Sequence, residues 1–161
     1  MEGLSIHEGD LLISSDRELL DYELIRNFLA SSYWSPGITM EQVRRQIDNS
    51  ALAFGMYRLP GLAVAAATEL PAPQQIGFCR VVTDLTRFAY LADVMIVEDE
   101  QRRGLGTKLV AAVMQHPELR GIRKWLLATK DAHGVYEKLG FEALPNPEAY
   151  MVLKPKDAQW I

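Results

Sequence analysis

Two closely spaced glycines mark the segment of this sequence best suited to bind an anion. Gly104 and Gly106 follow an apolar stretch that ends at Val97 and a polar run at 98–103, and they precede an apolar pattern typical of a helix. Glycine has no side chain to obstruct a ligand, so the amides of residues 102–106 can point together at a phosphate or pyrophosphate at the helix start. Basic side chains add positive charge nearby, at Arg102, Arg103 and Lys108. The alternative is a glycine turn that only begins a helix.

The spacing in this segment differs from two common nucleotide-binding motifs. A P-loop requires Gly-x-x-x-x-Gly-Lys followed by Ser or Thr, which is absent here. A dinucleotide fingerprint requires a small residue three positions after Gly106, where Leu109 stands. It also requires an acidic residue about twenty positions further on, where the chain has Lys124 and Trp125. ATP and NAD are therefore poor candidates.

Two motifs together suggest an acyl-CoA enzyme. Residues 101–106, with sequence QRRGLG, match the pattern Q/R-x-x-G-x-G/A in full, and residues 134–141 read GVYEKLGF. With both motifs in this order, the sequence resembles the GNAT superfamily of acyl-CoA-dependent N-acetyltransferases. The resemblance covers residues 11–153. It implies acetyl-CoA as acyl donor, no metal, and an amine acceptor, either a small molecule or a peptide.

The resemblance also implies which residues contact acetyl-CoA. Backbone groups of residues 94–97 would face the pantetheine arm, with an amide near Met95 or Ile96 polarising the thioester carbonyl. The turn that follows would hold the pyrophosphate. The complete expected set is Met95, Ile96, Val97, Gln101, Arg102, Arg103, Gly104, Leu105, Gly106 and Thr107.

Two residues are candidates for proton transfer. An alkyl amine is protonated at neutral pH and must lose a proton before it attacks a thioester. Asp93 could act as that base or hold an ammonium group, or it could be a strand-edge carboxylate bonded to backbone. By resemblance, Tyr136 would return a proton to the departing thiolate; the alternative is a core tyrosine packed on Phe141. Tyr90 and Ala92 stand where several relatives carry a glutamate base, which leaves the base open.

Tyr33 and Trp34 are candidates for acceptor binding. They lie between the first two expected helices, in a loop that borders the acceptor site in similar proteins. An aromatic wall there would suit an apolar or cationic amine. Core packing or the anchoring of a lid explains Trp34 equally well.

The elements that must position these residues follow from hydrophobic periodicity and capping signals. Helices are expected at 16–31 (capped by Asp16), from Thr39 to about 47, after Gly106, and at 131–140 (capped by Asp131). Strands are expected at 11–14, 51–57, 62–68, 75–83, 87–97, 122–129 and 149–153. This order predicts an α/β fold with a mixed, twisted sheet of six to seven strands and helices on both faces.

Length and charge set the remaining expectations. The chain has 161 residues, with 17 basic and 21 acidic side chains and a net charge of −4. That length suits a single domain over 1–161, and mild acidity argues against a nucleic-acid binder. No apolar stretch approaches the roughly 20 residues of a membrane span, so we expect no membrane binding. The single cysteine, Cys79, excludes an internal disulfide framework, and we expect a reducing, cytoplasmic setting. A monomer and a homodimer both stay open. The competing function is a non-catalytic module that binds or senses acyl-CoA.

Overall fold

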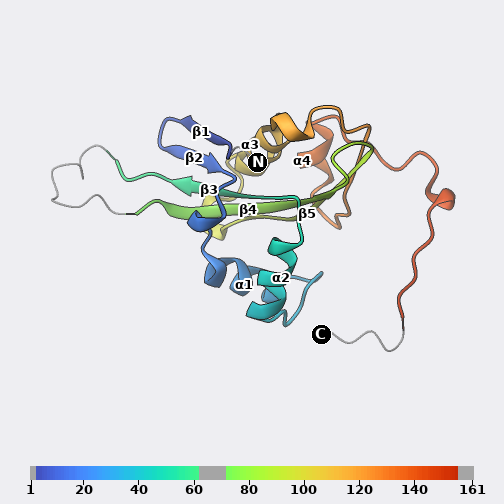
Figure 1. Cartoon of the computed structure of the whole chain (residues 1–161), viewed down its shortest axis with the longest axis horizontal. Helices are drawn as coiled ribbons and strands as arrows, with labels where there is room; N and C mark the ends of the chain where they lie inside the picture. Colours follow the sequence, from blue (N-terminus) through green and yellow to red (C-terminus); the bar gives the residue numbers. More distant parts are fainter. Residues whose placement is uncertain (1–2, 62–71, 156–161) are drawn as a thin grey trace.

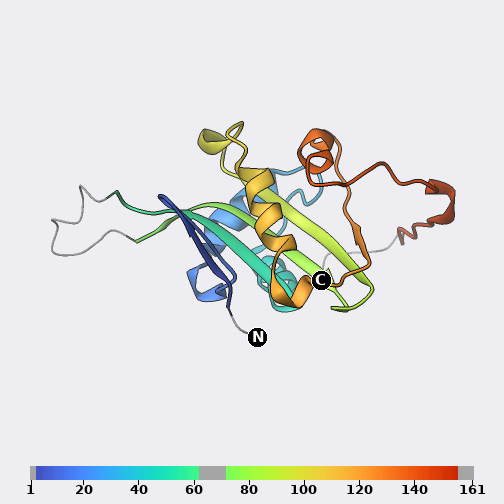
Figure 2. The ribbon, with the colours of Figure 1, turned by 90° about the horizontal axis from the view of Figure 1, so that it is seen from above.

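In the part of the chain that the structure describes, six strands form one sheet with helices packed on both of its faces (Figures 1 and 2). The computed structural model describes residues 3–61 and 72–155. The strands are β1 (Ser5–Glu8), β2 (Leu11–Ser14), β3 (Leu52–Arg58), β4 (Gln74–Thr83), β5 (Phe88–Ile96) and β6 (Lys124–Leu126). The α-helices are α1 (Tyr22–Ser31), α2 (Met40–Asp48), α3 (Leu105–Met114) and α4 (His133–Glu137). This confirms the predicted mixed α/β architecture.

The strands follow one another in chain order across the sheet. Neighbouring strands from β1 to β5 are antiparallel, and β5 pairs with β6 in parallel. Sequence analysis missed β1, whose four residues are mostly exposed. The strand expected at 62–68 lies outside the described residues.

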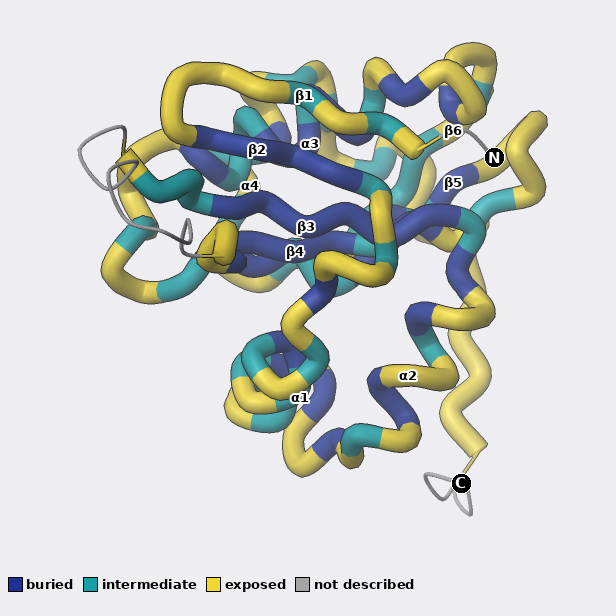
Figure 3. Tube along the Cα trace, turned by 60° about the vertical axis from the view of Figure 1, so that its left-hand side comes forward, coloured by how far each residue is buried: buried dark blue, intermediate teal, exposed yellow. Residues whose placement is uncertain are grey.

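Two apolar layers fix the helices on the sheet. On one face, α1 and α2 pack Ile25, Leu29 and Ile47 against strand residues that include Phe78 and Met95. On the other face, α3 and α4, drawn above the sheet in Figure 1, pack over a second core. Strands β2 and β3 are buried along nearly their whole length, and β4 is buried over its middle (Figure 3). Burial on both faces explains why these strands have long apolar runs rather than strict alternation.

Two helix starts differ from those predicted. Asp16 caps only a short 3₁₀ turn, because Leu20 is extended, and α1 begins after Asp21, whose side chain accepts from the Leu24 amide. Asp131 caps nothing: Ala132 precedes α4, and its amide donates to Thr129 Oγ1 instead. The capping box predicted at Thr39 and Gln42 is present in full at the start of α2.

The C-terminal strands are shorter than predicted. The strand expected at 122–129 is β6, with three residues, because the chain leaves β5 after Leu126. No strand forms at 149–153; a 3₁₀ turn, η5 (Pro147–Ala149), is followed by exposed residues that include Met151. A three-residue β6 offers little edge for another strand to pair with.

Candidate active site

The sheet opens beside the second half of β5. Strand β6 pairs with β5 only from Phe88 to Tyr90, whereas β5 continues to Ile96. Among the described residues, no strand lies beside Leu91–Ile96 on that edge. Backbone N–H and C=O groups on an open edge can pair with an extended ligand that has amide groups of its own.

A bulge interrupts the other edge of β5 at the same level. The pairs Phe78–Met95 and Arg80–Ala92 are in register, so two residues of β5, Asp93 and Val94, lie opposite the single residue Cys79. Asp93 adopts a φ of +54°, which is uncommon for a residue other than glycine. The bulge bends β5 where its partner β6 has already ended.

The glycine turn leads directly from the end of β5 into α3. Gly104, with φ +74°, is the N-cap of α3, and Arg102 also has a positive φ of +60°. Alternation of positive and negative φ along a turn lets successive amides converge on one point, as an anion site requires. The Gln101 side chain holds the turn to β5, because its Nε2 donates to Ile96 O at 2.9 Å. The turn therefore has positive φ values at two positions and a fixed attachment to β5, and its binding of an anion stays a prediction.

Not every residue predicted to contact acetyl-CoA presents its side chain. Met95 and Leu105 are buried in the two cores, and Ile96 is also buried, so only their backbone groups can reach a ligand. By contrast, Gln101, Arg102, Arg103 and Gly104 are exposed. Val97 and Thr107 are half-buried.

A cavity of about 650 Å³ lies where β5 leaves β6. It is lined by residues from both faces of the sheet: Tyr33, Trp34, Ser35, Gln46, Arg80, Tyr90–Val94, Leu127–Ala132 and Tyr136. The cavity thus brings together Tyr136, Asp93, Tyr33 and Trp34, the four residues predicted to catalyse or to bind the acceptor. A second cavity, of about 730 Å³, lies elsewhere, between Ser5, Arg17 and the start of β3.

Tyr136 lines this cavity from α4, on the face that carries α3. Its ring packs edge-on against Phe141, with centroids 5.9 Å apart, so the predicted core contact is present as well. Burial, reinforced by nearby Cys79, Tyr33 and Asp131, raises the pKa of Tyr136 to about 12. The phenol therefore keeps its proton throughout the neutral range and can donate it.

Asp93 lies on the face that carries α1 and α2, where both of its oxygens are engaged. Oδ2 accepts from Arg80 Nε at 2.6 Å, and Oδ1 accepts from Trp34 Nε1 at 3.1 Å. Its side chain is only 6% exposed, and that of Arg80 is 15% exposed. A carboxylate has lone pairs left after two hydrogen bonds, so Asp93 can still receive a further donor.

The loop between α1 and α2 forms the outer wall of the cavity. Tyr33 and Trp34 pack edge to face with centroids 4.9 Å apart, and both remain partly exposed. The Tyr33 hydroxyl accepts from the Lys130 amide at 3.0 Å, and the Lys130 ammonium lies 5.7 Å from the Tyr33 ring centroid. The loop thus bridges to the segment that follows β6.

Sequence analysis missed Arg80. A charged residue within the apolar run of β4 was the available signal, because a charge in such a strand requires a partner. The partner could not be identified from spacing, since the bulge decides which residue of β5 faces Arg80.

Over 3–61 and 72–155, no group of three or more His, Cys, Asp or Glu side chains could hold a metal ion. In the same part of the chain, no helix is long and apolar enough to cross a bilayer.

The chain is similar to known proteins in both sequence and fold. Residues 28–141 match the model of the acetyltransferase (GNAT) family. A Xanthomonas campestris crystal structure described as a GNAT-family acetyltransferase is 36% identical, with a TM-score of 0.76, covering 90% of this chain and 93% of that one. A Gibberella zeae protein named as a candidate acetyltransferase is 29% identical over 145 residues, 83% of this chain and 80% of its own length. Glucosamine-6-phosphate N-acetyltransferase from Arabidopsis thaliana shares the fold, with 17% identity, a TM-score of 0.53, and coverage of 84% of this chain and 88% of that one.

Proposed function

Because this chain belongs to the GNAT family of acetyltransferases, we propose that it transfers an acetyl group from acetyl-CoA to a primary amine. The amine attacks directly while both substrates are bound. The acyl donor lies along the open edge of β5, with its pyrophosphate at the turn formed by residues 101–106. The acceptor occupies the 650 Å³ cavity beside Tyr33 and Trp34.

One observation carries this proposal: a single cavity reaches side chains on both faces of the sheet at the open edge of β5. Tyr136 enters it from the α3 and α4 face, and Trp34 and Asp93 enter it from the α1 and α2 face. Direct transfer requires that a donor and an acceptor meet in one space from different directions. A module that only binds acyl-CoA does not need polar side chains such as Asp93 on the opposite side of the cavity.

Each step of the acyl transfer can be assigned to groups among the described residues. Asp93 attracts the acceptor ammonium and takes its proton, which frees the nitrogen lone pair to attack the thioester carbonyl carbon. Backbone amides near Met95 or Ile96 donate to the developing oxyanion. When the carbon–sulfur bond breaks, Tyr136 donates its proton to the thiolate. The attacking nitrogen then gives its second proton to the Tyr136 phenolate, and Asp93 releases the first proton to solvent. Burial disfavours both the thiolate and the phenolate, so the dry pocket that raises the pKa of Tyr136 also makes the sulfur more basic.

The test is a panel of acceptors incubated with acetyl-CoA: small amines, amino acids, aminosugars and peptides. We expect at least one primary amine to accelerate thiol release and to give an N-acetylated product by mass spectrometry. Reactions without amine and without protein are the controls. Saturable binding of acetyl-CoA with no acetylated product from any amine would support the sensing module instead.

A further inference from the structure

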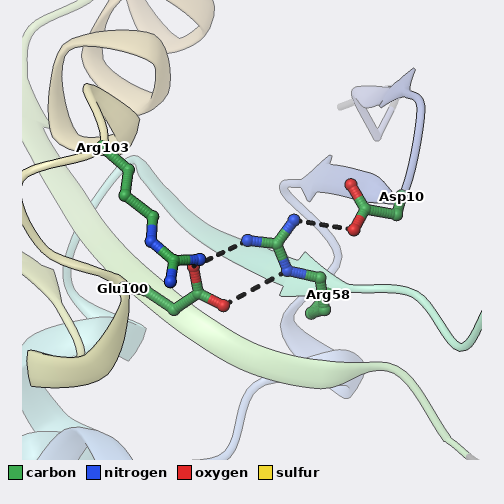
Figure 4. Close-up of polar contacts among 4 residues, drawn as sticks. All are labelled: Asp10, Arg58, Glu100 and Arg103. Atoms are coloured by element: carbon green, nitrogen blue, oxygen red, sulfur yellow. Dashed lines mark hydrogen bonds and ion pairs between the residues drawn. The ribbon is translucent and has the colours of Figure 1, made fainter.

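A chain of charged side chains connects the glycine turn to Arg58 at the C-terminal end of β3 (Figure 4). Glu100 is the last residue of a 3₁₀ turn, η3 (Glu98–Glu100), and directly precedes Gln101. Arg58, at the end of β3, donates twice to Glu100, through Nε to Oε1 at 3.3 Å and Nη2 to Oε2 at 2.7 Å. The pair joins two residues that lie 42 positions apart in the chain.

The network extends in both directions from this pair. Arg103, within the turn, donates from Nη1 to Glu100 Oε2 at 3.0 Å. On the other side, Arg58 Nη1 donates to Asp10 Oδ2 at 2.8 Å, in the loop between β1 and β2. Figure 4 shows Arg58 between Asp10 and Glu100, and Arg103 reaching Glu100 from the turn. The turn is thus held on two sides, at Ile96 through Gln101 and at β3 through Glu100.

The central pair differs from ordinary surface ion pairs. Only 26% of the Arg58 side chain and 16% of the Glu100 side chain are exposed, against 61% for Arg103. Water screens the charge of a partly buried carboxylate less than that of an exposed one. Without Arg58, the Glu100 charge would repel a pyrophosphate at the adjacent turn and would hold Arg103 away from it.

We propose that Arg58 is a positioning residue for the acyl donor, acting through Glu100. It neutralises this carboxylate and fixes its two oxygens, so that the turn amides keep their orientation and Arg103 is free to move to a phosphate oxygen. This inference rests on the proposed function, since it takes the turn at residues 101–106 to be the pyrophosphate site. Arg58 lies at the end of β3 and belongs to neither sequence motif.

The test compares two ligands that differ in the pyrophosphate. Calorimetry of Arg58→Met should show a dissociation constant for acetyl-CoA about tenfold above wild type, the scale for losing a charge-assisted pair. S-acetylpantetheine lacks the pyrophosphate and nucleotide, and its dissociation constant, measured by ¹⁵N NMR titration, should change less than twofold. Arg26→Met is the matched control, because Arg26 is paired with Glu23 on the surface of α1 at 3.6 Å. Its affinity for both ligands should equal that of wild type.

A double-mutant cycle shows whether Arg58 acts through Glu100. In a Glu100→Gln background, which removes the charge that Arg58 neutralises, Arg58→Met should weaken acetyl-CoA binding less than twofold. Arg58→Lys keeps the charge but not the paired hydrogen bonds, so its affinity should lie between those of wild type and Arg58→Met. Arg58→Lys also provides the test if Arg58→Met does not fold.

The outcomes separate this inference from the proposed function. If wild-type protein does not bind acetyl-CoA, both fail. If wild type binds and Arg58→Met binds as tightly as Arg26→Met, the positioning role is overturned and the proposed function stands. Equal losses for acetyl-CoA and S-acetylpantetheine, or an undiminished effect of Arg58→Met in the Glu100→Gln background, also overturn it.

Discussion

Trp34 Nε1 donates a hydrogen bond of 3.1 Å to Asp93 Oδ1, which fastens the loop after α1 to the bulge in β5. The same carboxylate accepts from Arg80, so three elements meet at one side chain. The sequence allowed two interpretations of Trp34: it lines the acceptor site, or it packs in the core or anchors the loop. The hydrogen bond shows that Trp34 anchors the loop, and Trp34 also lines the cavity. Its contact with an acceptor stays a prediction.

Trp34→Phe should weaken binding of the acceptor without changing binding of the acyl donor. Phenylalanine keeps an aromatic wall but removes the N–H, so the loop loses its tie to Asp93. With an acceptor found in the panel, we expect its KM to rise about fivefold, the scale of one partly exposed hydrogen bond to a charged group. The dissociation constant of acetyl-CoA should stay within twofold of wild type by calorimetry. A fall in acetyl-CoA affinity with an unchanged acceptor KM would place Trp34 on the donor side.

Tyr136→Phe tests the assignment of the proton donor. The substitution keeps the ring and its packing on Phe141 and removes only the hydroxyl. We expect kcat to fall roughly 10²-fold, with acetyl-CoA affinity and Tm little changed. An acyl donor with a more acidic thiol should recover part of the loss. Tyr22→Phe, on α1 and stacked with Arg44, is the control. Wild-type turnover by Tyr136→Phe, when chemistry limits the rate, would make Tyr136 a packing residue.

The pH profile follows from the raised pKa of Tyr136. The phenol must carry its proton to donate it, and with a pKa of about 12 it remains protonated up to pH 10. The acceptor amine, by contrast, becomes more reactive as it loses its proton with rising pH. The value of kcat should therefore rise or level off between pH 6 and 10, measured at saturating substrates. A descending limb with a midpoint well below pH 10 would contradict the role of this phenol.

A buried histidine predicts how stability depends on pH. His116 is 1% exposed, its Nδ1 accepts from the Glu118 amide at 3.2 Å, and burial lowers its pKa below 6.5. The unfolded chain therefore binds a proton at a higher pH than the folded protein does, so stability is fully present above pH 6.5 and falls below it. The Tm of wild type should drop more steeply from pH 7 to 5 than that of His116→Asn. His7→Asn, at an exposed position, should follow wild type.

Local sequence patterns predicted those parts of the site whose structure depends on residues close together in the chain. The turn at residues 101–106 depends on its own glycines, and Tyr136 depends on the short helix α4, which ends at Glu137 rather than at the predicted Gly140. The contacts of Asp93 could not be predicted from local patterns. Asp93 lies 13 positions after Arg80 in the chain, and the bulge in β5 determines that the two side chains face each other. Likewise, the contact of Arg58 with Glu100 depends on how β3, β4 and β5 are aligned, which hydrophobic patterns do not specify.

The position of the acyl donor is the central claim, and a ¹⁵N NMR titration with acetyl-CoA tests it most directly. The largest saturable shifts should fall on the amides of residues 102–106 and 94–97. Gly106→Ala should keep them, since an added Cβ lies in ordinary contact with Ile96 and Val135 at 3.9 Å, whereas the larger side chain of Gly106→Val should abolish them. No saturable shift, or largest shifts at the second cavity beside Ser5 and Arg17, would contradict the account.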